Sequence, residues 1–410
     1  MGGEPSFNHP FIILMVGVVI VLAILIRTTF ERLSLPPLIG FISLGFLMRW
    51  LEYNWGIFSP GAWHVFQLLA KIGIITLLFR IGLESNIGGL LHQLRRASFI
   101  WVGDVLISGG LGYAVAYYIL GWEFIPSLFV AAALTATSVG ISVGVWQNAG
   151  ALQSPTGELL IDVAELHDIS GIVLMALLFA LAPVLKNGTS AALLPMVLTT
   201  GGILLLKLLG FGAFCFVFSQ YVEQHVTRWF ERITKPPVSL LVVAGIGFIM
   251  AAFAGLIGFS SAIGAFFAGL VFSRDPDAVK LEAAFGPVYE LFSPFFFIGI
   301  GLHIDPAVVV PGLAVGGILL VVAVLGKLWG DGLGAFWVLG WTGAVLLGLS
   351  MVPRAEIAMV IMNKGLELGP WAVPSEVYAG MVVVSLTTCV LASLTVRILL
   401  KRWPQEQTSG

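Results

Sequence analysis

Apolar runs of about twenty residues recur along the chain from Phe11 almost to its end, with short polar segments between them. A helix needs roughly 20 apolar residues to cross the hydrocarbon core of a bilayer. The pattern predicts about thirteen transmembrane helices, which begin near residues 10, 36, 64, 97, 124, 156, 192, 237, 260, 284, 306, 342 and 377. We therefore expect an all-α polytopic membrane protein.

Composition supports this expectation. Hydrophobic residues make up 58% of the chain and charged residues 10%, and the mean hydropathy is +1.01, which excludes an ordinary soluble domain. Cys215 and Cys389 both lie in apolar runs, so we expect small buried residues and not a disulfide or a metal site. The first ten residues carry no Lys or Arg, so we expect the first span to be retained and not cleaved as a signal peptide. No feature suggests nucleic-acid binding or a cofactor.

The basic residues predict the orientation. An odd number of spans places the termini on opposite sides, and an N-terminus outside puts twelve Lys and Arg in cytoplasmic segments and three in outside segments. Because cytoplasmic loops are enriched in Lys and Arg, we expect a multi-pass protein of the inner (plasma) membrane with its C-terminus in the cytoplasm.

Two parts of the chain resemble each other. Residues 39–45 and 263–269 both begin Ile-Gly and end in Gly, and residues 81–83 and 300–302 both read Ile-Gly-Leu. A linker helix between the copies would make them enter the membrane from opposite sides. We predict two inverted six-helix repeats, which in transporters place the site near the midplane. The alternative is chance likeness, since small residues serve helix packing in any membrane protein.

The predicted sixth span, from residue 156, is the richest in ionisable side chains, which are costly inside a membrane. Asp168 lies roughly 15 Å into it at about 1.5 Å per residue. Glu158, Asp162 and Glu165 fall on the same side of the helix and form a predicted cytoplasmic funnel for cations. The alternative for Glu158 is a favourable contact with the positive end of its helix.

A buried carboxylate suits cation/proton exchange. It can hold a proton or a cation, and competition for one charge couples the two fluxes. Oxygen ligands suit alkali cations, so Asp168 is the candidate ligand for the transported metal ion.

Two spans contain residues that favour a helix break. Hydroxyls interrupt the fifth span at Thr137 and Ser138, and Pro353 must disrupt the twelfth. A broken helix frees carbonyl groups for a cation and points half-helix dipoles at the site. Thr137 and Ser138 could instead bond their own backbone, and Arg354 and Glu356 could neutralise each other.

Lys327 in the eleventh span needs a carboxylate partner if it is buried. Asp168 or Asp331 could supply it, and the alternative is a lysine that reaches the cytoplasmic interface. We interpret Asp104 and Glu84 as packing residues or residues of the panel helices.

Together these segments resemble the cation/proton antiporter family, in the branch of NapA-like sodium/proton and KefC-like potassium/proton antiporters. The likeness rests on seven short segments, at residues 35–40, 78–84, 135–138, 167–168, 264–269, 326–327 and 353–356. It implies the NhaA-like fold with discontinuous crossing helices, a homodimer in lipid, and a core domain that moves like an elevator. By this resemblance Asp168 is the ion-binding aspartate, Thr137 and Ser138 form the first helix break, and Lys327 is the lysine that pairs with the residue before the aspartate in two-aspartate members.

The resemblance also predicts the division of the chain. The panel or dimerisation helices would occupy residues 1–96 and 237–305, the core helices with the ion site residues 97–190 and 306–410, and a linker helix with a cytoplasmic loop residues 191–236. Lys327, Arg354 and Glu356 would compensate charge in the core.

The residue before the aspartate departs from the family pattern. Family members look like Asp, Asn or Gln there, whereas this chain has His167. A histidine could carry a proton or act as a neutral amide does, and we favour the neutral role and electroneutral exchange of Na+ or K+ for H+.

Two other functions remain open. A sodium-coupled symporter of an organic solute would need a polar substrate pocket, and no second polar cluster is evident. An intramembrane hydrolase could use Glu165, His167 and Asp168 with a metal, but no HExxH motif supports it. We expect a transporter and not an enzyme.

Overall fold

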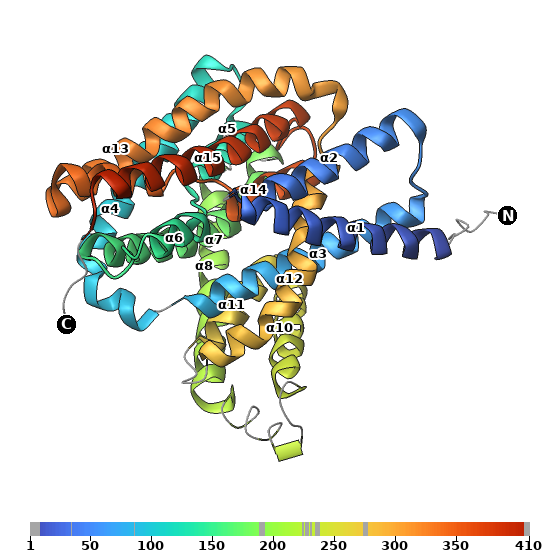
Figure 1. The fold of residues 1–410 in the computed structure, drawn as a ribbon, viewed down its shortest axis with the longest axis horizontal. Coiled ribbons are helices and arrows are strands. Elements are labelled where there is room, and N and C mark those ends of the chain that lie inside the picture. Colours follow the sequence, from blue (N-terminus) through green and yellow to red (C-terminus); the bar gives the residue numbers. More distant parts are fainter. Residues whose placement is uncertain are drawn as a thin grey trace. The chain divides into compact units, whose positions relative to one another are not determined.

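The computed structural model describes residues 9–33, 35–85, 87–187, 193–223, 225, 229, 232–233, 238–273 and 278–405. These residues are almost entirely helical and contain no strand (Figure 1). The α-helices are α1 (His9–Arg32), α2 (Leu38–Trp55), α3 (Pro60–Glu84), α4 (Ile87–Ala114), α5 (Phe124–Thr135), α6 (Val139–Asn148), α7 (Pro155–Asn187), α8 (Leu193–Val217), α10 (Val238–Leu256), α11 (Ser261–Phe272), α12 (Ala278–Leu302), α13 (Val309–Ser350), α14 (Glu356–Leu368) and α15 (Ser375–Arg402).

Nine helices in the described ranges are long and apolar enough to cross a membrane, and two shorter apolar segments, Val242–Leu256 and Ser261–Phe272, add to them. The predicted fifth span consists of the half-helices α5 and α6, and the predicted twelfth consists of the end of α13 and α14. Both predicted helix breaks are therefore present. The predicted fold class, an all-α membrane protein with two discontinuous helices, is confirmed.

The chain divides into two compact units. The first comprises Met1–Thr29, Gly40–Asn86 and Leu198–His303, and the second comprises Phe30–Ile39, Ile87–Val197 and Ile304–Gly410. The assignment of panel and core roles to parts of the chain stays a prediction. Two of its boundaries, at residues 190 and 236, lie outside the described residues, as do the predicted cytoplasmic cations Arg228, Lys235 and Arg274.

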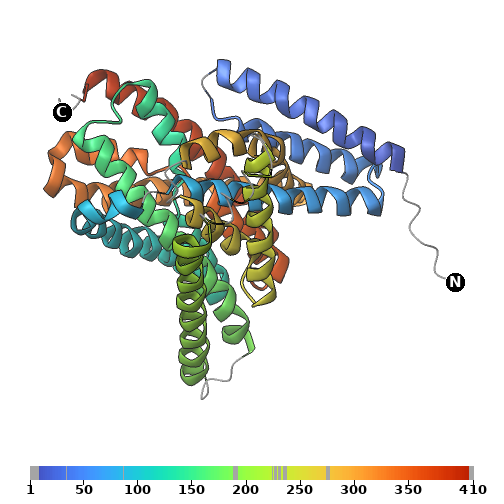
Figure 2. The ribbon, with the colours of Figure 1, turned by 90° about the horizontal axis from the view of Figure 1, so that it is seen from below.

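The first unit holds α1, α2 and α3, whose blue ribbons lie next to one another in Figure 2, together with most of α8 and with α10 to α12. Glycines let its helices approach closely. A Cβ atom on Gly45 of α2 would overlap the carbonyl oxygen of Ile298 in α12, and one on Gly301 of α12 would overlap that of Ile42 in α2. Neither position has room for a side chain.

The same contact occurs a second time in this unit, between α3 and α11. A Cβ atom on Gly269 would overlap the carbonyl oxygen of Phe79, and one on Gly82 would overlap that of Phe266. Gly269 and Gly82 are the residues that the sequence pairs with Gly45 and Gly301 of the α2–α12 contact. The predicted repeat is therefore present as matching helix contacts, which chance likeness of glycine-rich helices would not produce.

The second unit contains α4 to α7 and α13 to α15. Helix α13 is a hairpin of two helices, because Gly340 has φ 72° and ψ −170° in its middle. The later part returns along the earlier part, so that a Cβ atom on Gly348 would lie 3.3 Å from the Cα atom of Leu328. Helices α13 and α15 lie side by side (Figure 1). Cys389 of α15 is buried and free, as is Cys215 of the first unit, which confirms the prediction for both.

Candidate functional site

The first helix break lies between α5 and α6 in the second unit. Ala136 and Ser138 have extended backbone, with ψ angles of 146° and 99°. Thr137 and Ser138 are 3% and 1% exposed, so their backbone groups cannot be satisfied by bulk water and need partners within the protein. The interruption of the apolar run by hydroxyl-bearing residues coincides with the break, as predicted.

The second break follows α13. Pro353 has no N–H group and disfavours helical backbone at the residue before it, and the helix has already ended at Ser350. Ala355 takes φ −138° and ψ −92°, and α14 begins at Glu356. The predicted disruption by proline is therefore confirmed.

The two breaks contact each other. The backbone N–H of Ser138 donates to the carbonyl oxygen of Pro353 at 2.9 Å, and the hydroxyl of Thr137 donates to that of Met351 at 3.3 Å. From about two turns further along α6, Trp146 Nε1 donates to the hydroxyl of Ser350 at 2.8 Å. Segments about two hundred residues apart in the sequence thus satisfy each other's backbone at one crossing.

Buried cations cap the two half-helix ends at which carbonyl groups are left over. Lys327 Nζ donates to the carbonyl oxygen of Thr135, the last residue of α5, at 3.1 Å. Arg354 Nη1 donates to those of Met351 and Val352, after the end of α13, at 2.9 and 3.1 Å. The C-terminal end of a helix carries partial negative charge, so both cations lie where the backbone attracts them.

Glu356 occupies the opposite kind of helix end. It lies in the first turn of α14, where the partial positive charge of the helix favours an anion. Since Arg354 donates to carbonyl groups, the alternative in which Arg354 and Glu356 serve only to neutralise each other does not describe this site.

Asp168 lies on the face of α7 that meets the crossing. Gly171 is one helical turn further along the same side, and a Cβ atom there would lie 3.1 Å from Ile357 Cγ2 of α14 and 3.9 Å from Ala136 Cβ of the first break. Asp168 itself is partly buried. The part of α7 that carries Asp168 therefore packs, one turn further on, against α14 and against Ala136 of the first break.

Next to Asp168, His167 belongs to a cluster of four buried ionisable residues from α4, α7 and α13. Lys327 Nζ lies 2.5 Å from Asp104 Oδ2 and 3.2 Å from Asp331 Oδ2. His167 Nε2 lies 2.9 Å from Asp104 Oδ2 and 3.3 Å from Asp331 Oδ1. All four side chains are at most 1% exposed. We call these residues, Asp104, His167, Lys327 and Asp331, the four-residue cluster.

The cluster corrects the interpretation of Asp104 and completes that of Lys327. Asp331 was one of the two predicted partners of Lys327, whereas Asp104 was interpreted as a packing residue and is instead ion-paired to both Lys327 and His167. Lys327 is completely buried, so the alternative of a lysine at the membrane interface is wrong. Glu84, also interpreted as packing, pairs with Arg80 one turn earlier in α3.

A groove of glycines on α13 lets Asp104 reach its partners. Cβ atoms on Gly326, Gly330 and Gly334 would lie 2.9 Å from Ser108 Oγ, 2.6 Å from Asp104 Cα and 2.9 Å from Ile100 Cα, all in α4. Glycines at every fourth position of a membrane helix mark a close helix contact. This spacing was the signal in the sequence that could have paired α4 with α13 and Asp104 with Lys327.

Both ring nitrogens of His167 face acceptors. Nδ1 lies 3.0 Å from the carbonyl oxygen of Val163 and Nε2 lies 2.9 Å from Asp104 Oδ2. A neutral imidazole donates from one nitrogen only, whereas the imidazolium donates from both. The neutral role expected for His167 would leave one of these two contacts without a hydrogen.

Ligand atoms of Asp104, His167 and Asp331 lie within 4.8 Å of one another, close enough for a metal ion. The ammonium group of Lys327 pairs with both carboxylates and so already occupies the place of a cation. The arrangement is not that of the hydrolase alternative, in which Glu165 and Asp168 would join His167 at a metal.

The predicted funnel lies along the first turns of α7. Glu158 is exposed, while Asp162 and Glu165 are partly buried, and Glu158 is near enough to act electrostatically on Asp162. Whether these residues guide cations stays a prediction.

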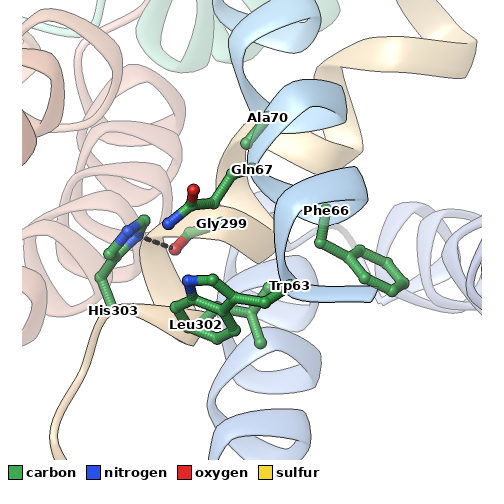
Figure 3. Close-up of a pocket in the computed structure, with 7 residues that line it drawn as sticks. All are labelled: Trp63, Phe66, Gln67, Ala70, Gly299, Leu302 and His303. Atoms are coloured by element: carbon green, nitrogen blue, oxygen red, sulfur yellow. Dashed lines mark hydrogen bonds between the residues drawn. The ribbon is translucent and has the colours of Figure 1, made fainter. Parts of the chain in front are cut away.

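A small cavity in the first unit lies apart from these residues in the sequence. Trp63 and Gln67 of α3 and His303, just beyond α12, line it, and His303 Nδ1 contacts the carbonyl oxygen of Gly299 at 2.7 Å (Figure 3). Its volume is about 10 Å³, room for about one water molecule. None of the predicted site residues lines it, and it does not supply the substrate pocket that an organic solute would need.

Two half-helix pairs that cross, with capped ends and a carboxylate on the neighbouring helix, define a class of protein: the secondary transporters with discontinuous membrane helices. Comparison with known proteins identifies the family. The transmembrane domain of the sodium/hydrogen exchangers matches residues 18–402. The chain belongs to this family of cation/proton antiporters.

Individual relatives agree with this assignment. The high-affinity Na+/H+ antiporter NhaS3 of Synechocystis sp. is 29% identical over 336 residues, 80% of this chain and 70% of that protein. A Na+/H+ antiporter of Enterococcus hirae is 28% identical over 392 residues, 92% of this chain and 97% of that protein. The Na+/H+-K+ antiporter GerN of Bacillus cereus is 28% identical over 373 residues, 88% of this chain and 89% of that protein.

A solved structure supports the fold. The sodium proton antiporter MjNhaP1 from Methanocaldococcus jannaschii at pH 8 superimposes with a TM-score of 0.70 at 16% identity and covers 96% of both chains. The predicted family and the NhaA-like antiporter fold are thus confirmed.

Proposed function

We propose that this chain exchanges Na+ or K+ for H+ across the cell membrane and that the two ions compete for the carboxylate of Asp168. The observation that carries the proposal is the contact of Gly171, one helical turn after Asp168 on α7, with Ile357 at the start of α14 and with Ala136 of the first break. A carboxylate there can accept a cation or a proton but not both, so each ion displaces the other. The relatives named for Na+/H+ and Na+/H+-K+ exchange support monovalent cations as substrates.

The remaining ligands come from the first break. Thr137 and Ser138 supply hydroxyl and carbonyl oxygens, which suit alkali cations. The half-helix ends beside them are capped by Lys327, Arg354 and Glu356, so that the fixed charges of the crossing are offset within the protein. Asp168 is then the group whose occupant changes during transport.

Electroneutral exchange follows from this assignment. If one cation replaces one proton on Asp168, the charge of the loaded site is the same in both directions of transport. We further propose that the protein is a homodimer in the plasma membrane, and that the unit which carries Asp168 moves to expose the site to either side, as in an elevator. The division of the chain into two compact units supports such a motion.

The test is transport in liposomes that contain a pH-sensitive dye, with an imposed proton gradient and added Na+, K+ or Li+. We expect one or more of these cations to collapse the gradient with the wild-type protein and none to do so with Asp168→Asn, because an amide cannot exchange a proton for a cation. Asp305→Asn is the matched control. Asp305 is the N-cap of a short 3₁₀ helix at Pro306–Val308, and Asn serves as well in that role.

Competition between cation and proton for Asp168 leads to a second, independent expectation. The apparent KM for the cation should rise as the pH falls while the maximal rate at saturating cation stays the same. Exchange that persists in Asp168→Asn would refute the role of Asp168. Wild-type protein that exchanges no cation for protons would refute the antiport proposal and favour the sodium-coupled symporter.

A further inference from the structure

The four-residue cluster contains two carboxylates, Asp104 and Asp331, to which the proposed exchange at Asp168 assigns no role. Both are completely buried. A buried carboxylate that loses its partner strongly destabilises the fold, so the two carboxylates persist in the interior only with partners such as Lys327 and His167. We therefore infer the function of Asp104 and Asp331 from the residues that they bind.

These bound residues, Lys327 and His167, are connected to the proposed ion site in two ways. Lys327, which lies 2.5 Å from Asp104, also donates to the carbonyl oxygen of Thr135, the residue at which α5 ends and the first break begins. His167, which lies 2.9 Å from Asp104, precedes Asp168 in the chain. Helix α4 is thus linked through Asp104 to both the helix break and the exchanging carboxylate.

The charges of the cluster balance. Both ring nitrogens of His167 lie within hydrogen-bond distance of an acceptor, and the imidazolium, with one positive charge, offers an N–H group to each. Together with the ammonium of Lys327 it offsets the two carboxylates. The guanidinium of Arg354 also acts on Asp104 and Asp331, but its hydrogen bonds go to the carbonyl groups after α13.

We propose that Asp104 and Asp331 are positioning residues: they hold Lys327 and His167 in a charge-neutral buried cluster, and through Lys327 they fix the end of α5 at which the first helix break begins. The inference rests on the proposed function of Asp168 and adds the residues that set the geometry around it. The proposal also gives His167 a defined role: its positive charge allows two carboxylates to bind the same lysine.

The test uses compensation of charge. Asp104→Asn leaves the cluster with one positive charge too many, whereas Asp104→Asn combined with His167→Gln restores the balance. We expect the single variant Asp104→Asn to lower the cation exchange rate at least about tenfold and to lower the melting temperature by roughly 5 °C or more. The double variant should regain most of both, and His167→Gln alone should be impaired because it leaves an excess negative charge.

The control is Glu367→Gln, which makes the same change of acid to amide in an exposed pair with Lys364 and should alter neither quantity. A merely structural role for Asp104 predicts that the second substitution lowers the exchange rate and the melting temperature further. A double variant with lower values than Asp104→Asn would overturn the proposal. So would an Asp104→Asn variant that behaves like wild type. If Asp104→Asn does not fold, a folded double variant is the expected result and an unfolded one is contrary to it.

The melting temperatures separate this inference from the proposed function. Recovery of stability in the double variant tests the cluster whether or not transport is observed. Loss of exchange in Asp168→Asn, with unchanged stability of the cluster, tests the proposed function alone.

Discussion

Single glycines set the spacing of helices in both units. At Gly45, Gly82, Gly269 and Gly301 the carbonyl oxygen of a facing helix lies where a Cβ atom would be. Close backbone approach of this kind is a main source of helix association in membranes, where burial of apolar surface gives little advantage over contact with lipid. The need for the glycine is steric at these positions, since none of the four has positive φ.

We predict that Gly301→Ala destabilises the protein by about 1–3 kcal/mol, because the added methyl group forces α12 away from Ile42 of α2. Thermal unfolding of the purified protein in detergent, followed by tryptophan fluorescence, measures the change. Gly245→Ala is the control, since Gly245 lies inside α10 of the same unit with no atom within 4 Å of the added Cβ. Equal melting temperatures for the two variants would contradict the steric account.

The two broken helices are the elements that form the proposed site, and charged side chains lie at three of their ends. Lys327 and Arg354 bind the carbonyl groups left by α5 and α13, and Glu356 lies at the start of α14. Continuous helices would satisfy these groups within themselves. Broken ones require buried charges, which explains why ionisable residues that are costly in a membrane occur here.

We predict that Arg354→Gln lowers the free energy of unfolding by about 3 kcal/mol, because it removes a completely buried cation near two buried carboxylates. Lys364→Gln removes an exposed cation from a pair with Glu367 and should cost less than about 1 kcal/mol. Unfolding by denaturant in mixed micelles compares the two. If both variants lose the same small amount, the capping of α13 by Arg354 contributes little.

At the scale of the whole molecule, the distribution of basic residues predicts the orientation in the membrane. With the N-terminus outside, the span formed by α5 and α6 begins outside at Glu123 and ends in the cytoplasm at Asn148. Both residues are exposed, so they report on the two sides of one broken span.

We predict that a membrane-impermeant maleimide added to intact cells labels Glu123→Cys and labels Asn148→Cys only after permeabilisation. The native Cys215 and Cys389 are buried and give the unlabelled control in the parent protein. The reverse pattern would show that the N-terminus lies in the cytoplasm and that the funnel of Glu158 opens outward.

Particular residues show how far prediction from the sequence reached. The hydroxyls at Thr137 and Ser138 and the proline at position 353 marked both helix breaks, because polar residues and proline interrupt an apolar helical run in the local sequence. The partners of Lys327 were predicted only in part, since Asp331 is one turn away on the same helix whereas Asp104 lies on α4.

By itself the sequence determined the membrane class and the helix breaks, and it pointed to the repeat and to Asp168 as the candidate ion ligand, because hydropathy, glycine spacing and the cost of intramembrane charge are local properties of the chain. The tertiary structure alone decided that Asp104 joins His167, Lys327 and Asp331, and that Arg354 caps α13. Which buried charges meet depends on how closely two helices pack, and here that distance was set by the glycine groove of α13 against α4.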